Sequence, residues 1–207
     1  MPTSPKGYTS ITNLQNYLLI TIDASFHEQV GTTWLLSVEK IIDNFCGRNF
    51  IADTAESQKT YEIVLKKAVD IEGSFPSIRS LIIDEAVDVT GLTVDDEEVS
   101  TGDWLLYPMN DTPKVEVRLR DTSTAVLTID QQNIKVTAKW GYSVTVPSDI
   151  EWAATVLLAG IVQHAWSSEG EVESVTLGRY TLSYKSKKEL NDFETVTEIL
   201  KTYQKYQ

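Results

Sequence analysis

Apolar residues recur at three- or four-residue steps near both ends of the chain, a period typical of helices that bury one face. The longest such stripe lies in residues 25–46 and consists of Phe26, Val30, Trp34, Val38, Ile42 and Phe45. Residues 11–20 and 188–205 carry shorter stripes of the same period. We therefore predict helices over these three ranges. We expect the first ten residues, which are polar and include two prolines, to form a loose arm.

From about residue 58 the apolar period changes from 3.6 to 2, which is typical of strands with one buried face. The clearest cases are "KVEVRLR" at 114–120 and "IKVTAKW" at 134–140, where apolar and polar residues alternate without a break. Residues 58–142 are therefore predicted to form a region of antiparallel strands, placed between helical segments on either side.

The segment that follows predicts a helix of a different kind, over residues 148–167. Ser148 and Glu151 have the spacing of a capping box, in which the two side chains satisfy the free backbone donors of the first turn. From there to Val162 the polar faces are nearly absent. A helix that is apolar all round is buried on all sides. Either neighbouring subunits cover part of it, or it is the central helix of the chain's own core.

Together these patterns predict an α+β fold: a small bundle of about four helices, an inserted antiparallel β-rich lobe, and a β-hairpin before the last helix. The hairpin is indicated by Gly178-Arg179, a two-residue turn with glycine first. The expected divisions are 1–57 for the N-terminal helices, 58–142 for the β-rich lobe, and 143–207 for the C-terminal helices and hairpin.

Charge and cysteine content narrow the functional classes. The 207 residues include 30 acidic and 18 basic ones, for a formal net charge of −12. This argues against a broad basic surface that holds nucleic acid by its phosphates, but it suits a channel through which DNA must slide. The single cysteine, Cys46, cannot form an internal disulfide, and this favours a cytosolic origin. The longest apolar run, Trp152 to Val162, is shorter than the ~20 residues that cross a bilayer, so we expect no membrane contact.

The sequence offers no constellation for catalysis. It lacks phosphate-binding glycine loops, a nucleophile elbow and paired cysteines. "HEQVG" at 27–31 resembles half of a zinc motif, but Gly31 stands where the second ligand is required. The acidic run Asp95 to Glu98 lacks the alternating oxygens of a calcium loop, and a solvated loop is expected there. We therefore predict no catalytic, cofactor or metal residues, no cofactor, and a Cys46 that packs as a small apolar residue.

The order of several motifs resembles that of the head–tail connector, or adaptor, proteins of tailed bacteriophages. These motifs are, in order, "YTSITNLQNYLL", "IIDNFCGRNF", "VTAKWGYSVTVPSDIEWAATVLLAGIVQHAW", "VTLGRYTLSY" and "ILKTYQKY". They belong to the helical parts at both ends and cover more than half of the chain. The β-rich region from about 58 to 133 is longer than in compact helical members of that family.

The resemblance implies a structural virion protein, made in the host cytoplasm and located in the neck between capsid and tail. Such proteins form a ring, commonly twelve-fold, beneath the portal protein, extend the DNA channel, and offer a platform for the next neck or tail protein. Combined with the apolar helix and the C-terminal stripe, it predicts two sets of contacts. We expect subunit contacts through Trp152, Val156, Val162 and Trp166. We expect portal contacts through Phe193, Leu200, Tyr203 and Tyr206.

Other functions stay open at this point. The chain could form a different neck ring, such as a stopper or tail-completion protein. It could also be a small enzyme whose site is built from scattered carboxylates, or a nucleic-acid-binding module. The first alternative differs in which ring the protein contacts, the second in showing turnover, and the third in binding DNA in a salt-sensitive way.

Overall fold

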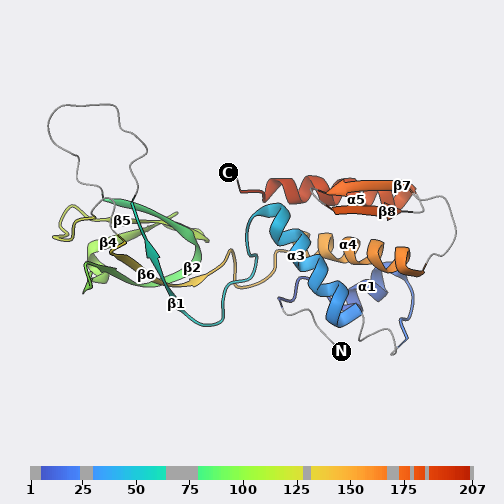
Figure 1. Cartoon of the computed structure of the whole chain (residues 1–207), viewed down its shortest axis with the longest axis horizontal. Helices are drawn as coiled ribbons and strands as arrows, with labels where there is room; N and C mark the ends of the chain where they lie inside the picture. The colour runs from blue at the N-terminus through green and yellow to red at the C-terminus, as the bar shows by residue number, and fades with distance from the viewer. Residues whose placement is uncertain are drawn as a thin grey trace, which may run out of the picture. The chain divides into compact units, whose positions relative to one another are not determined.

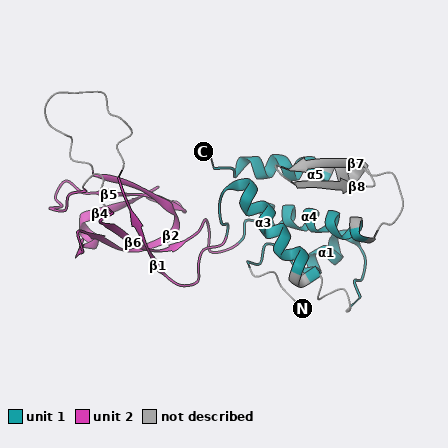
Figure 2. Ribbon diagram, viewed as in Figure 1, with its two compact units in different colours: residues 1–50, 146–207 teal, residues 51–145 magenta. Residues whose placement is uncertain are grey.

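The fold is described from a computed structural model of the whole chain. The structure describes residues 6–23, 30–63, 79–127, 132–166, 173–177, 180–184 and 187–205. Figure 2 shows that the chain forms two compact units. Unit 1 comprises Met1–Phe50 and Val146–Gln207, and unit 2 comprises Ile51–Thr145. The chain thus leaves the first unit once and returns to it once.

Unit 1 is helical, and its elements come from both ends of the chain (Figure 1). Its α-helices in the described residues are α1 (Ile11–Leu18), α3 (Leu35–Cys46), α4 (Ser148–Trp166) and α5 (Lys187–Thr202). A two-stranded antiparallel hairpin, β7 (Glu173–Leu177) and β8 (Tyr180–Tyr184), precedes α5. The predicted turn at 178–179 lies outside the described residues, and the flanking strands pair Leu177 with Tyr180.

Local signals explain where α1 begins and where α3 ends. The Ser10 side chain accepts a hydrogen bond from the Asn13 backbone N–H at 3.1 Å, which satisfies one free donor at the start of α1. Gly47 closes α3 in the left-handed region, with φ +67°, as the glycine that follows a helix often does. Its N–H donates to the Asp43 carbonyl.

The helix predicted over 25–46 is confirmed from Leu35 to Cys46, and the turn before it is not a regular α-helix. Residues 24–29 lie outside the described residues, and a π-helical turn, η1 (Val30–Trp34), precedes α3. The sequence of this turn, Gly31-Thr32-Thr33, combines one glycine with two β-branched residues, all of which disfavour a regular α-helix. The apolar stripe continues through it, since Val30, Val38 and Ile42 are all buried.

The N-terminal segment is also less loose than predicted. From Lys6 onward it packs into unit 1, with Tyr8 and Thr9 buried. The hydroxyl of Thr9 lies 2.6 Å from that of Thr155 on α4. Each buried hydroxyl therefore has a partner, and the segment leading into α1 is part of the core.

Unit 2 is an antiparallel sheet with strand order β1-β6-β2-β5-β4, and β3 pairs with β2 beside this path. The strands are β1 (Ser57–Tyr61), β2 (Ser80–Val94), β3 (Glu97–Glu98), β4 (Trp104–Tyr107), β5 (Lys114–Leu119) and β6 (Ile134–Trp140). The long β2 pairs with β5 along its first half and with β6 along its second, and its register shifts between Ala86 and Asp88 and between Val89 and Gly91. Such irregularities bend a strand and increase its twist.

The alternating pattern in the sequence gives unit 2 its core. Alternate residues of β6, namely Ile134, Val136, Ala138 and Trp140, are buried. They pack with Leu81, Ile83, Leu92, Val117 and Leu119 from β2 and β5. The predicted strands at 114–120 and 134–140 are therefore confirmed, as is the α+β fold class. No helix within the described ranges is long and apolar enough to cross a membrane.

The two ends of unit 2 are held together where its chain begins and ends. Ile51 and Ser143 form an isolated parallel β-bridge, and the Ala52 N–H donates to the Ser143 carbonyl at 2.9 Å. Gly141, two residues before Ser143, has φ +144° and passes very close to the backbone of Ile51 and Ala52. A Cβ atom on Gly141 would lie 2.4 Å from Ala52 Cα and 2.7 Å from the Ile51 carbonyl oxygen. Both the conformation and the space require glycine.

Replacing Gly141 with Ala should therefore destabilise unit 2 by at least about 2 kcal/mol, because the added methyl group meets backbone and the φ angle is unfavourable. The matched control is Gly102→Ala, whose Cβ would lie 3.9 Å from Ser100 Oγ, an ordinary contact distance. That change should stay within about 0.5 kcal/mol of the parent chain. Denaturant unfolding followed by circular dichroism measures both. Equal stabilities for the two variants would contradict this account of Gly141.

Candidate assembly surface

Helix α4 is the centre of unit 1, and the chain itself covers its apolar faces. Helices α1, α3 and α5 and strand β8 all pack against it (Figure 1). Every residue from Ala153 to Gly160 is buried. Of the two explanations for an all-apolar helix, the structure supports the central helix of the chain's own core.

Because α4 is covered in this way, most of the described residues predicted to make subunit contacts are not exposed. Val156 is 2% exposed and Val162 is fully buried, so both belong to the interior of one copy. Trp152 is half-buried, one turn into α4. The side chain of Trp166 lies outside the described residues. Contact through these residues stays a prediction, and Trp152 is the described one that presents part of its side chain at the surface.

The predicted capping box at the start of α4 is wrong. In the described part of the chain the Glu151 carboxylate accepts a hydrogen bond from Asn13 Nδ2 at 2.7 Å. The Glu151 N–H donates to the Pro147 carbonyl at 3.0 Å, as a residue within a helix does. The physical reason is tertiary: α1 brings Asn13 within reach of Glu151. The carboxylate therefore joins α1 to α4 and does not cap its own helix.

The predicted portal-contact residues also have partners within unit 1. Phe193 and Leu200 on α5 are fully buried. Tyr203 packs its ring against Phe50 in a T-shaped arrangement, with 5.3 Å between centroids. Its hydroxyl donates to Asp149 Oδ2 at 2.8 Å, which ties the end of α5 to the start of α4. Tyr206 lies outside the described residues, and contact of these four residues with a portal stays a prediction.

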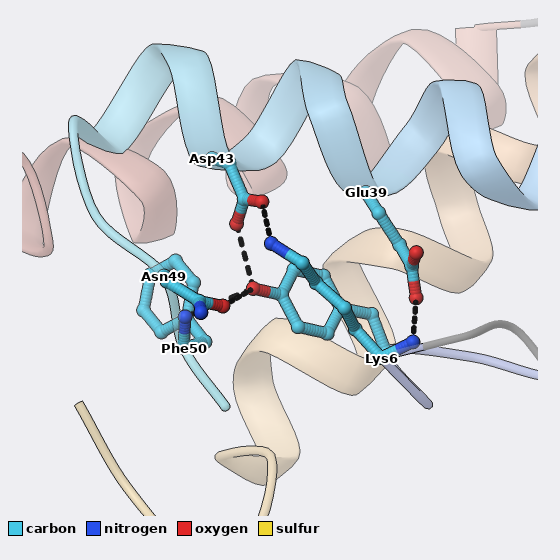
Figure 3. A network of polar contacts seen from close by, with 6 residues as sticks. Lys6, Glu39, Asp43, Asn49 and Phe50 are labelled. Carbon is cyan, nitrogen blue, oxygen red and sulfur yellow. Dashed lines mark hydrogen bonds and ion pairs between the residues drawn. The ribbon is translucent and has the colours of Figure 1, made fainter. Parts of the chain in front are cut away.

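A polar network that the sequence did not reveal holds the N-terminal segment against α3 (Figure 3). The Tyr8 hydroxyl donates to Asp43 Oδ1 at 2.6 Å and accepts from the Phe50 N–H at 2.9 Å. Lys6 forms an ion pair with Asp43, and its backbone N–H donates to Glu39 Oε1 at 2.9 Å. Burial, with the nearby Asp43 carboxylate as a further cause, raises the pKa of Tyr8 above its ordinary value. The aromatic residue within a polar segment was the one signal of this network in the sequence.

Cys46 behaves as the sequence predicted, as a packed side chain at the end of α3. It is fully buried, and its thiol donates to the Leu200 carbonyl at 3.5 Å. Burial raises the pKa of the thiol from 9.0 to about 12. The thiolate is the reactive form of cysteine, so a thiol that stays protonated at neutral pH is chemically inert.

The acidic run in unit 2 forms a hairpin turn. Asp95 and Asp96 join β2 to β3 with φ angles of +53° and +63°, as a type I′ turn requires. Lys135 pairs with Asp96, and the hydrogen bond from Lys135 lowers the pKa of that carboxyl group. Asn133 Nδ2 donates to Asp95 Oδ1 at 2.5 Å. Among the described residues, no group of three or more His, Cys, Asp or Glu side chains could hold a metal ion.

Comparison with known proteins addresses the chain as a whole. The profile of a family described as "Head completion protein" matches residues 9–206. No curated protein sequence matches the chain.

Three solved structures share the fold, at 11–12% sequence identity, and each is covered from 93% to 94% of its length by 99% to 100% of this chain. They are described as the neck of an empty gene transfer agent particle computed with C6 symmetry (TM-score 0.57), the virion of a native gene transfer agent particle (0.54), and the neck of the native particle computed with C12 symmetry (0.51).

The buried thiol gives a testable pH dependence. Below pH 9 the Cys46 thiol is protonated in both folded and unfolded chains, so its contribution to stability is constant. Between pH 9 and about 12 the unfolded thiol ionises while the folded one keeps its proton. The unfolding free energy should therefore fall as pH rises, by at most about 1.4 kcal/mol per pH unit from this group.

The control is Cys46→Ala, which keeps the tyrosines and lysines that titrate in the same range. Denaturant unfolding from about pH 8 to about pH 11 measures the free energy of unfolding of both chains. The amount by which the parent exceeds the variant should become smaller above pH 9. Parallel stability curves would show that the thiol titrates normally in the folded chain.

Proposed function

The chain belongs to the head completion protein family, and we propose from this premise that it is a structural protein of the neck of a tailed phage or phage-like particle. In this proposal copies of the chain form a twelve-fold ring. The ring binds beneath the portal protein, extends the DNA channel, and offers its other side to the next neck or tail protein.

The observation that carries the proposal is the extent of the family match. It runs from residue 9 to residue 206, and so includes both the helical unit and the β-sheet unit. The likeness to the neck and virion structures likewise extends over nearly the whole of both chains. A match confined to unit 1 would say nothing about the role of unit 2. The match to the entire chain supports one role for both units.

Two further observations support a ring around DNA. The neck structures similar to this chain are described with six- and twelve-fold symmetry, which closed rings possess. The chain carries a net charge of −12, and acidic residues outnumber basic ones in unit 2. A surface of this sign repels phosphates, so DNA can pass without being held. We propose a structural role without catalysis, in keeping with the family.

Particle assembly tests the proposal directly. A phage or particle that lacks this chain should fill heads with DNA but fail to join them to tails, and supplying the chain in trans should restore joined particles. Electron microscopy of the restored particles should show a ring of the chain in contact with the portal. A ring separated from the portal by another protein would assign the chain to a stopper or tail-completion role. Joined particles without the chain would refute the neck proposal.

The channel role makes a separate prediction about DNA. Because the net charge is strongly negative, the free chain should show no measurable binding to duplex DNA at physiological salt. Fluorescence anisotropy of a labelled duplex measures this, with a basic DNA-binding protein as the positive control. Micromolar affinity that weakens steeply with added salt would contradict the channel role, since it would indicate a phosphate-binding surface.

A further inference from the structure

The turn after α1 exposes two large apolar side chains. Leu19 is 90% exposed and Ile20 is 37% exposed, directly after the last helical residue, Leu18. Gln15, Asn16 and Thr21 join them in lining a shallow hollow at this end of α1. A second hollow shares Asn16 and extends across to Trp152 on α4. We call Asn16, Leu19, Ile20 and Trp152 the α1 surface.

Leu19 has an unfavourable backbone conformation, and within one copy its side chain is not buried, so burial does not compensate for that cost. Its φ and ψ are +56° and +38°, the left-handed region that closes many helices. The Leu19 N–H donates to the Gln15 carbonyl, and the Ile20 N–H reaches the same oxygen at 3.2 Å. Glycine or asparagine is usual at this position, and a β-carbon costs roughly 1–2 kcal/mol there. An almost fully exposed leucine gains no burial in return.

The α1 surface also lacks charge, in a chain that is otherwise rich in it. Residues 7–22 contain no Asp, Glu, Lys, Arg or His, although charged residues make up 23% of the chain. The exposed polar positions along α1, such as Thr12 and Asn16, carry neutral side chains. The second hollow does include a charged residue, Glu151, whose carboxylate accepts the hydrogen bond from Asn13.

We propose that the α1 surface is where a second copy of this chain binds, as the contact between neighbours in the ring. The inference rests on the proposed neck function and specifies one of its interfaces. Two copies that each carry −12 repel one another, and a contact through side chains without charge adds nothing to that repulsion. The centres of protein interfaces are depleted in charged residues and enriched in aromatic ones, and the α1 surface contains Trp152 and no charged residue. Burial of Leu19 by the neighbour offsets the cost of its backbone conformation.

The contact is heterologous, because a ring needs the α1 surface of one copy to meet a different surface of the next. It agrees with the sequence-based expectation that Trp152 takes part in subunit contact. It differs from that expectation in which helix supplies most of the contact. The exposed end of α1 supplies the apolar side chains, while most of α4 is buried inside its own unit.

Substitution of Leu19 separates a role in folding from a role in assembly. Leu19→Gly removes the unfavourable conformation, so the free full-length chain should be at least as stable as the parent, by denaturant unfolding. Incorporation into particles should nevertheless fall, by about tenfold if some 1.4 kcal/mol of contact is lost at each interface. A variant that is less stable and assembles normally would overturn the inference.

A charge placed on the surface gives a second test with a matched control. Leu19→Asp should reduce incorporation more than Leu19→Gly does, because it adds like charge to the contact. Val144→Asp is the control, since Val144 is 79% exposed and belongs to unit 2. It should enter particles as the parent does. Equal incorporation of Leu19→Asp and the parent would overturn the inference, and a parent chain that fails to enter particles at all would instead refute the neck proposal.

Cross-linking identifies the occupant of the surface. Leu19→Cys places an accessible thiol on the surface, while the native Cys46 is buried and unreactive. After attachment of a benzophenone maleimide and irradiation of assembled particles, mass spectrometry should find the introduced thiol joined to a peptide of a second copy. Val144→Cys is the labelling control. A peptide of a different protein, or no product above that control, would show that neighbouring copies do not meet here.

Discussion

Unit 1 depends on the burial of α4, a helix that is apolar on nearly all sides from Trp152 to Val162. Such a helix cannot lie at a protein surface, so other elements must surround it. Helices α1 and α3 come from the start of the chain, and β8 and α5 come from its end. The core therefore cannot form until both ends of the chain have met. At the first turn of α4, the hydrogen bond from Asn13 to Glu151 then fixes α1, and the one from Tyr203 to Asp149 fixes the end of α5.

The sequence predicted the elements well because their signals are local. Period-two alternation in 134–140 and the stripe through Val38 and Ile42 each describe which face of one element is buried. Local patterns cannot show which partner covers that face. An apolar stripe looks the same whether its partner lies in the same chain or another, and the contacts between proteins predicted for Val156, Phe193 and Leu200 rest on such stripes. The structure places all three in the interior of one copy.

The remaining differences also come from tertiary contacts. Ser148 and Glu151 have the spacing of a capping box, but Asn13, distant in the sequence, holds the carboxylate. Tyr8 stands in a polar segment that was predicted to be loose, and Asp43 and Phe50 supply partners for its hydroxyl. The exposure of Leu19 was not predicted either, and its cause is the local backbone conformation, not a tertiary contact. It continues an apolar stripe in the sequence, and only the left-handed turn after Leu18 directs it away from the core.

The bridge between Ile51 and Ser143 has a consequence for how such a protein can vary between relatives. Because the chain enters and leaves the sheet unit at adjacent residues, the helical unit requires only that these two points stay together. Insertion of a domain is tolerated best at sites of this kind. The sheet unit could be enlarged, reduced or exchanged over generations while the order and packing of the helices persist. One unit can thus change in size while the other keeps its packing.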